Sequence, residues 1–212
     1  TASHNPKWDN GYKVYLGGRI ATGDAAGVQI IPPADAEIAQ AVAEAPAADE
    51  LSLDDARLHP DTRDAYVEAA RRLGDPGADI SIVLTPMHGV GGELGKRALT
   101  EAGFGRVVSV EKQWAPDPEF PTVAFPNPEE PGALDLALDR ARCQDADVVI
   151  ASDPDADRCA VAAVIDGQWR MLTGDELGTL LGDDALRRGV DGVYANSIVS
   201  STALATLASA AG

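Results

Sequence analysis

Three aspartates, Asp153, Asp155 and Asp157, occupy alternate positions in a six-residue segment that ends at Arg158. In an extended segment, alternate side chains project to the same side, so the three carboxylates are expected to lie close together. Each pair would repel by roughly 4 kcal/mol at a separation of about 4 Å and an effective dielectric constant of about 20. A divalent cation would remove this repulsion, and an all-oxygen ligand set suits Mg²⁺, Mn²⁺ or Ca²⁺. We therefore predict a metal site here.

Apolar runs flank the acidic segment at residues 148–151 and 159–165, and both predict buried strands joined by a short loop. A solvated acidic turn is the simpler alternative, but the apolar flanks and the adjoining arginine favour the metal site. An EF-hand does not fit, because Arg158 stands where glycine is required and Val164 where a bidentate glutamate is required. A nucleophilic Asp153, as in enzymes that form an aspartyl phosphate, stays open from the spacing alone.

A hydroxyl, an imidazole and an amide lie close together in residues 1–6, Thr-Ala-Ser-His-Asn-Pro. Ser3 is a candidate nucleophile or phosphate carrier with His4 beside it, although a turn that ends at proline also explains the segment. Asn10-Gly11 favours a hairpin that folds the chain back past Ser3 and brings Lys13 near it. The segment is therefore a second candidate site, without the Gly-x-Ser-x-Gly pattern of an esterase.

A glycine-rich segment, Thr-Pro-Met-His-Gly-Val-Gly-Gly at residues 85–92, follows a predicted strand and opens a predicted helix. An anion could bind to backbone N–H groups at such a position. The segment lacks the Gly-Lys-Ser/Thr ending of a P-loop. Its glycines are equally explained by tight packing of the helix against the sheet.

The composition is that of a globular protein, with 212 residues, 45% hydrophobic and 24% charged. A net charge of −17 argues against nucleic acid and anionic membrane surfaces as partners. No apolar run approaches the 18 residues of a membrane span, and no signal peptide is visible. Cys143 and Cys159 are expected to be small buried residues in a reducing compartment, which predicts a cytoplasmic protein.

Helical and strand patterns alternate after residue 62, which predicts an α/β fold with mixed, largely parallel sheets flanked by helices. An earlier helical pattern at 36–44 is followed by a linker at 45–55, rich in Ala, Pro and Asp. The later helices are expected at 62–73, 93–102, 134–142, 175–187 and 201–209, and the strands at 80–84, 107–110, 148–151, 159–165, 169–172 and 192–199.

Taken together, these segments resemble the α-D-phosphohexomutase superfamily of phosphoglucomutases and phosphomannomutases. Residues 1–6 are similar to its phosphoserine loop, and residues 153–158 to its Asp-x-Asp-x-Asp-Arg metal loop, in the same order along the chain. Residues 85–91 and 120–132 resemble the branch that includes phosphoglucomutase-2-like and phosphopentomutase enzymes. The likeness extends through nearly the whole chain.

The resemblance implies repeated α/β domains, of which this chain would hold a part. Residues 1–48 would end the phosphoserine-bearing domain I, residues 49–169 would form the metal-binding domain II, and residues 170–212 would begin the sugar-binding domain III. The chain opens without methionine and ends after a predicted helix, so we expect a fragment that shows no turnover by itself. The identity of the sugar, whether glucose, mannose or a pentose, stays open.

The resemblance also implies a mechanism in which a phosphoserine exchanges its phosphoryl group with the C1 and C6 hydroxyls of a hexose phosphate through a bisphosphate intermediate. Glucose 1,6-bisphosphate would serve as activator and small-molecule sugar phosphates as partners. A catalytically silent metal-binding module and an aspartate-nucleophile phosphatase stay as alternatives. The implied residues are Ser3, Lys13 and His4 for catalysis, Arg158 for phosphate binding, and Asp153, Asp155, Asp157 and the phosphate on Ser3 for Mg²⁺.

Overall fold

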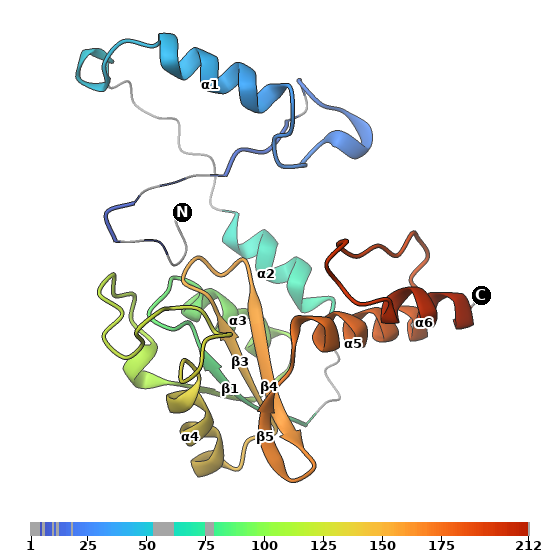
Figure 1. Cartoon of the computed structure of the whole chain (residues 1–212). Helices are drawn as coiled ribbons and strands as arrows, with labels where there is room; N and C mark the ends of the chain where they lie inside the picture. Colours follow the sequence, from blue (N-terminus) through green and yellow to red (C-terminus); the bar gives the residue numbers. More distant parts are fainter. Residues whose placement is uncertain are drawn as a thin grey trace. The chain divides into compact units, whose positions relative to one another are not determined.

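A computed structural model describes residues 5, 7–9, 11, 13–17, 19–52, 62–74 and 79–211. These residues form two compact units (Figure 1), one within residues 8–62 and the other comprising residues 63–211 with Asn5 and Lys7. Ser3 and His4 lie outside the described residues, as do Asn10 and residues 53–61. The predicted return of the chain past Ser3 therefore falls outside the described part.

The smaller unit contains one helix and a short antiparallel pairing. Residues 14–16 pair with residues 28–30 through backbone hydrogen bonds of 2.8–3.0 Å. Helix α1 (Ala34–Glu44) follows and confirms the helical pattern expected at 36–44. Two 3₁₀ turns, Gly23–Ala25 and Ala48–Glu50, complete the regular structure described in this unit.

The larger unit is built on one five-stranded sheet with the strand order β2-β1-β3-β4-β5. Strand β1 runs parallel to β2 and β3, whereas β3–β4 and β4–β5 are antiparallel pairs. The expected mixed α/β sheet is thus confirmed, with its parallel part made by helical crossovers and its antiparallel part by short turns. The strands are β1 (Ser81–Thr85), β2 (Arg106–Ser109), β3 (Val148–Ser152), β4 (Cys159–Ile165) and β5 (Gln168–Met171).

Helices pack against this sheet, and the chain continues in helices after the last strand (Figure 1). Within the described ranges, none of the helices combines the length and apolarity that crossing a membrane would require. The helices are α2 (Arg63–Arg71), α3 (Gly92–Glu101), α4 (Asp135–Gln144), α5 (Gly174–Arg187) and α6 (Ala203–Ala211), with a 3₁₀ turn at Glu111–Gln113.

The main hydrophobic core lies between α4 and one face of the sheet. Val83 and Val149 from the central strands are fully buried against Ala137 and Ala141 of α4. Side chains alternate along a strand, so Leu84 points to the opposite face, where it lies beside Gly95 of the helix α3. The sheet is therefore packed on both faces around β1 and β3, the two strands that precede the candidate site.

The expected strand at residues 192–199 is wrong. This segment has no regular secondary structure, and its apolar residues Val193 and Val199 are 97% and 89% exposed. A strand requires a neighbour that satisfies its backbone hydrogen-bonding groups. No described segment pairs with residues 192–199, so the apolar pattern alone does not make a strand.

The expectation of two buried cysteines is also wrong, because Cys143 and Cys159 are both exposed. Cys159 is the first residue of β4, where alternate residues such as Ala160 and Ala162 face the core. Cys143 lies in the last turn of α4, two residues after the buried Ala141. In both elements the periodicity assigns the thiol to the outer face.

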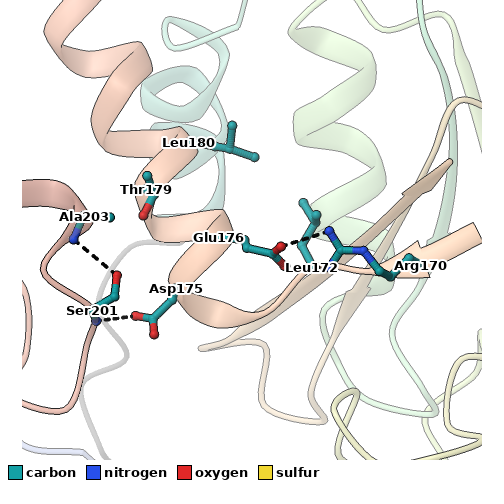
Figure 2. A pocket seen from close by; sticks show the side chains of 8 residues that line it. All are labelled: Arg170, Leu172, Asp175, Glu176, Thr179, Leu180, Ser201 and Ala203. Atoms are coloured by element: carbon teal, nitrogen blue, oxygen red, sulfur yellow. Dashed lines mark hydrogen bonds and ion pairs between the residues drawn. The ribbon is translucent and has the colours of Figure 1, made fainter. Parts of the chain in front are cut away.

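Helix α5 begins with a capping box that is tied to the sheet. The Thr173 hydroxyl accepts a hydrogen bond from the Glu176 N–H at 3.2 Å, and the Glu176 carboxylate accepts one from the Thr173 N–H at 2.8 Å. Figure 2 shows Arg170 of β5 reaching the same carboxylate, with contacts of 2.8 and 2.9 Å. The Arg170 guanidinium and then the Thr173 N–H lower the pKa of Glu176 to about 2.

A titration of the Glu176 carboxyl group by NMR is expected to give a midpoint near 2, well below its usual 4.5. Because the pKa is lowered in the folded state, ionised Glu176 contributes its full stability above pH 4.5 and loses it as the pH falls towards 2. Arg170→Ala should return the midpoint towards 4.5, whereas Arg188→Ala, which removes a surface arginine paired with Asp184, should leave it unchanged. A midpoint near 4.5 in the unaltered protein would contradict the capping geometry.

Candidate metal-binding site

The three aspartates lie in the loop that joins β3 to β4. Ser152 and Cys159 are the last paired residues of this antiparallel ladder, so residues 153–158 close a hairpin. The expected short loop between two strands is thus confirmed. Because β1 and β3 are parallel neighbours, the segment between β1 and α3, residues 86–91, reaches the same edge of the sheet as this loop.

The carboxylates of the acidic loop converge. One oxygen from each of Asp153, Asp155 and Asp157 lies within 4.8 Å of the other two. The expected extended backbone is wrong, however, because the Ala156 N–H donates to the Asp153 carbonyl at 3.0 Å and Ala156 has a φ of 59°. A hairpin loop must reverse the chain, so a turn brings the aspartates together in place of strand alternation.

Arg158 holds the first aspartate of the loop. Asp153 is 0% exposed, and its Oδ1 accepts a hydrogen bond from the Arg158 backbone N–H at 3.0 Å. Its Oδ2 accepts from Nε and Nη2 of the guanidinium at 3.1 and 2.9 Å. The same guanidinium lies 3.7 Å from Asp157. A buried carboxylate needs such a partner, because burying an unpaired charge is strongly unfavourable.

The residues present fit a hard divalent cation. All the converging atoms are carboxylate oxygens that lie within 4.8 Å of one another, so they need to move by about 0.6 Å at most to reach the roughly 4.2 Å that two Mg²⁺–oxygen bonds of about 2.1 Å can span. Arg158 offsets one of the three carboxylate charges, which leaves two formal negative charges on the loop. The loop also grades from the buried Asp153 through the half-buried Asp155 to the exposed Asp157, so a cation would have one anchored ligand and access to solvent.

A cavity of about 620 Å³ adjoins the acidic loop. Asp155, Asp157 and Arg158 line it together with residues of α2, α3 and the sheet, most of which are apolar. The charged groups are thus accessible from a hollow in the surface, which is where a small ligand would approach them.

Residues 64–164 match the model of the phosphoglucomutase/phosphomannomutase family, alpha/beta/alpha domain II. Over 216 aligned residues the chain is 45% identical to the probable phosphomannomutase of Haemophilus influenzae, in an alignment that covers 98% of this chain and 44% of the relative. The chain belongs to the phosphohexomutase superfamily. The matched range contains the acidic loop and the whole sheet except the last residue of β4 and all of β5.

Other members of the superfamily show similar likeness. The phosphopentomutase of Mus musculus is 43% identical over 198 residues, which cover 86% of this chain and 31% of the relative. The crystal structure of a candidate phosphomannomutase from Thermus thermophilus superposes with a TM-score of 0.62 at 27% identity, covering 89% of this chain and 40% of that one. The chain spans less than half the length of each of these relatives.

The structure places only part of the phosphohexomutase site expected from the sequence. It brings together Asp153, Asp155, Asp157 and Arg158 in one loop. Lys13 is exposed in the smaller unit, and its proximity to Ser3 stays a prediction. Ser3 and His4 lie outside the described residues, so their roles stay predictions as well.

A buried polar network around the segment that follows β1 was not predicted from the sequence. The Thr85 hydroxyl donates to the Gln113 side chain at 2.7 Å, and Thr122 bonds to both Gln113 at 3.0 Å and His88 at 2.8 Å. Thr85 and Gln113 are fully buried, and His88 nearly so. The available signal was a pair of polar residues, Thr85 and His88, beside glycines directly after an apolar strand.

Proposed function

We propose that this protein is a Mg²⁺-dependent phosphosugar mutase, which moves a phosphoryl group between two hydroxyls of a sugar phosphate. Membership of the superfamily supports the reaction type, and the relatives named for phosphomannose and phosphopentose substrates support sugar phosphates as the substrate class. The observation that carries the proposal is the convergence of Asp153, Asp155 and Asp157 in one hairpin loop. A hexose with reacting C1 and C6 hydroxyls is the proposed substrate.

The acidic loop would hold Mg²⁺ through Asp153, Asp155 and Asp157. When bound, the cation supplies positive charge that neutralises phosphoryl oxygens, which is the main requirement of phosphoryl transfer. Arg158 holds the Asp153 carboxylate in position by three hydrogen bonds. Its side chain is 46% exposed and a guanidinium carries five N–H donors, so we also propose that it binds a substrate phosphate.

Ser3 is proposed to carry the exchanged phosphoryl group. The bond between its oxygen and phosphorus breaks as a hydroxyl of the sugar monophosphate forms a new bond to phosphorus, and Lys13, with His4, accepts the hydroxyl proton. The resulting bisphosphate then returns its other phosphoryl group to Ser3. Glucose 1,6-bisphosphate would start the cycle by phosphorylating Ser3. We propose residues 1–48, 49–169 and 170–212 as parts of three successive domains.

A phosphatase with Asp153 as nucleophile is disfavoured by the geometry of that residue. Its carboxylate is 0% exposed, and both of its oxygens accept hydrogen bonds from Arg158. A nucleophile must reach the phosphorus of its substrate, so Asp153 would have to leave both the interior and its partner.

Transfer of label from ³²P-labelled glucose 1,6-bisphosphate tests the proposed function. With Mg²⁺ present, we expect the protein to retain a covalent phosphate that resists hydroxylamine, as a phosphoserine does. A label released by hydroxylamine would be an acyl phosphate and would support the phosphatase. Binding of Mn²⁺ without any label would support the silent metal-binding module.

A further inference from the structure

Two glycines of the segment after β1 lie directly against the acidic loop. A Cβ atom on Gly89 would be 2.4 Å from Cα and 2.5 Å from the carbonyl oxygen of Pro154. A Cβ atom on Gly91 would be 2.6 Å from the Cβ of Ala156. Between them, the Val90 N–H donates a hydrogen bond to the Pro154 carbonyl at 2.9 Å. The backbone of one loop therefore supports the backbone of the other.

The segment after β1 is itself held in place by hydrogen bonds to buried groups. The His88 N–H donates to the Gln113 carbonyl at 2.8 Å, and the His88 ring bonds to Thr122 at 2.8 Å. The Met87 N–H donates to the Thr85 hydroxyl at 3.1 Å, and Thr85 and Met87 are both fully buried. Because its donors and acceptors are engaged in the interior, this segment is expected to move less than the exposed end of the acidic loop when a side chain is added between the two.

We propose that Gly89 and Gly91 are positioning residues for the metal site. This proposal rests on the Mg²⁺ site of the proposed function. Their lack of side chains lets the loop approach closely enough for its turn to bring the three aspartates together. A Cβ at either position would displace the acidic loop by roughly 1 Å, whereas a functional constellation must be held within about 0.5 Å. The glycines touch no ligand and act through Pro154 and Ala156.

The two glycines differ in what they face, and this difference makes the proposal testable. Gly89 faces the backbone of Pro154, which no substitution can trim. A Cβ atom on Gly91 meets two side chains, the Ala156 methyl at 2.6 Å and the Ser152 hydroxyl at 3.2 Å. Removal of the Ala156 methyl relieves the severe contact, and a small shift of the Ser152 hydroxyl is enough for the other. Ala156 has a φ of 59°, a conformation that glycine adopts without strain, so Ala156→Gly should be tolerated.

The test measures binding of Mn²⁺ alone to the 212-residue chain by the loss of the free-ion electron paramagnetic resonance signal. Gly89→Ala and Gly91→Ala should each weaken binding by about 10-fold or more, the scale of effects transmitted to a metal through supporting residues. Ala156→Gly combined with Gly91→Ala should restore the affinity to within about threefold of the unaltered chain, whereas combined with Gly89→Ala it should not. Gly95→Ala is the matched control, because its Cβ would meet only Leu84 at an ordinary 3.8 Å.

Each other outcome counts against a stated part of the proposal. Unchanged Mn²⁺ affinity in Gly91→Ala, or no recovery in the double variant, would overturn the positioning role while leaving the metal site in place. An unaltered chain whose Mn²⁺ binding is absent, or is insensitive to Asp155→Ala, would overturn the metal site and the proposed function with it. Circular dichroism monitors folding, and if Gly89→Ala does not fold, the pair of Gly91 and Ala156 variants decides.

Discussion

Asp155→Ala is expected to abolish Mg²⁺-dependent turnover of the intact mutase and to weaken Mn²⁺ binding to this chain by at least about 100-fold. Asp155 is one of the three proposed oxygen ligands, and loss of residues that merely support a metal ligand already reduces affinity by about 10–100-fold. The substitution also removes repulsion within the loop, so the thermal midpoint measured in EDTA should not fall. Calorimetric titration with Mn²⁺ and a coupled assay of sugar 6-phosphate formation provide the two measurements.

Asp139→Ala is the control for the change in net charge. Asp139 is exposed on α4 and paired with Arg142 three residues later, away from the acidic loop. This variant should bind Mn²⁺ like the unaltered protein. An Asp155→Ala protein with normal turnover in EDTA-treated buffer would show that the acidic loop is not the catalytic metal site.

In the intact mutase, Ser3→Ala is expected to remove the covalent phosphate and nearly all turnover, with little change in thermal stability. A phosphoserine carries about −1.5 to −2 charges near pH 7 and would be stabilised by the cation and by Arg158. Alanine keeps the size of the residue but has no oxygen to carry a phosphoryl group. Incubation with labelled glucose 1,6-bisphosphate, followed by peptide mass spectrometry, locates the label.

Ser200→Ala provides the comparison for this experiment. Ser200 shares a hydrogen bond of 2.9 Å with Ser197 in an exposed turn, which accounts for both hydroxyls structurally. Its loss should leave labelling and turnover unchanged. Label on a residue other than Ser3, or near-normal turnover of Ser3→Ala, would remove Ser3 from the proposed mechanism.

The elements around the acidic loop could be predicted because their signals are local. Residues 148–151 and 159–165 are continuous apolar runs, and the short polar segment between two such runs leaves room for little except a hairpin loop. The conformation of that loop could not be derived from the alternation of side-chain directions, because side chains alternate with a period of two residues only along a strand. The turn at Ala156 depends on how β3 and β4 pair, and such pairing is decided by the fold.

The supporting contacts could not be predicted because they join distant parts of the chain. Gln113 lies 28 residues from Thr85 along the sequence, and His88 lies 34 residues from Thr122. None of these residues stands in a pattern that marks it as buried. Conversely, residues 192–199 have the local pattern of a strand, but a strand also depends on a partner, which the described residues do not supply.

The pairing of Asp153 with Arg158 has a consequence for how the loop would exchange its cation with solvent. The arginine is a counterion that belongs to the protein, so an incoming cation meets two unbalanced charges and a carboxylate already fixed in position. Less ordering of the loop is then required on binding, and fewer charges are exposed on release. Such a site favours rapid and reversible binding of an abundant cation. It is less suited to permanent binding of a scarce cation.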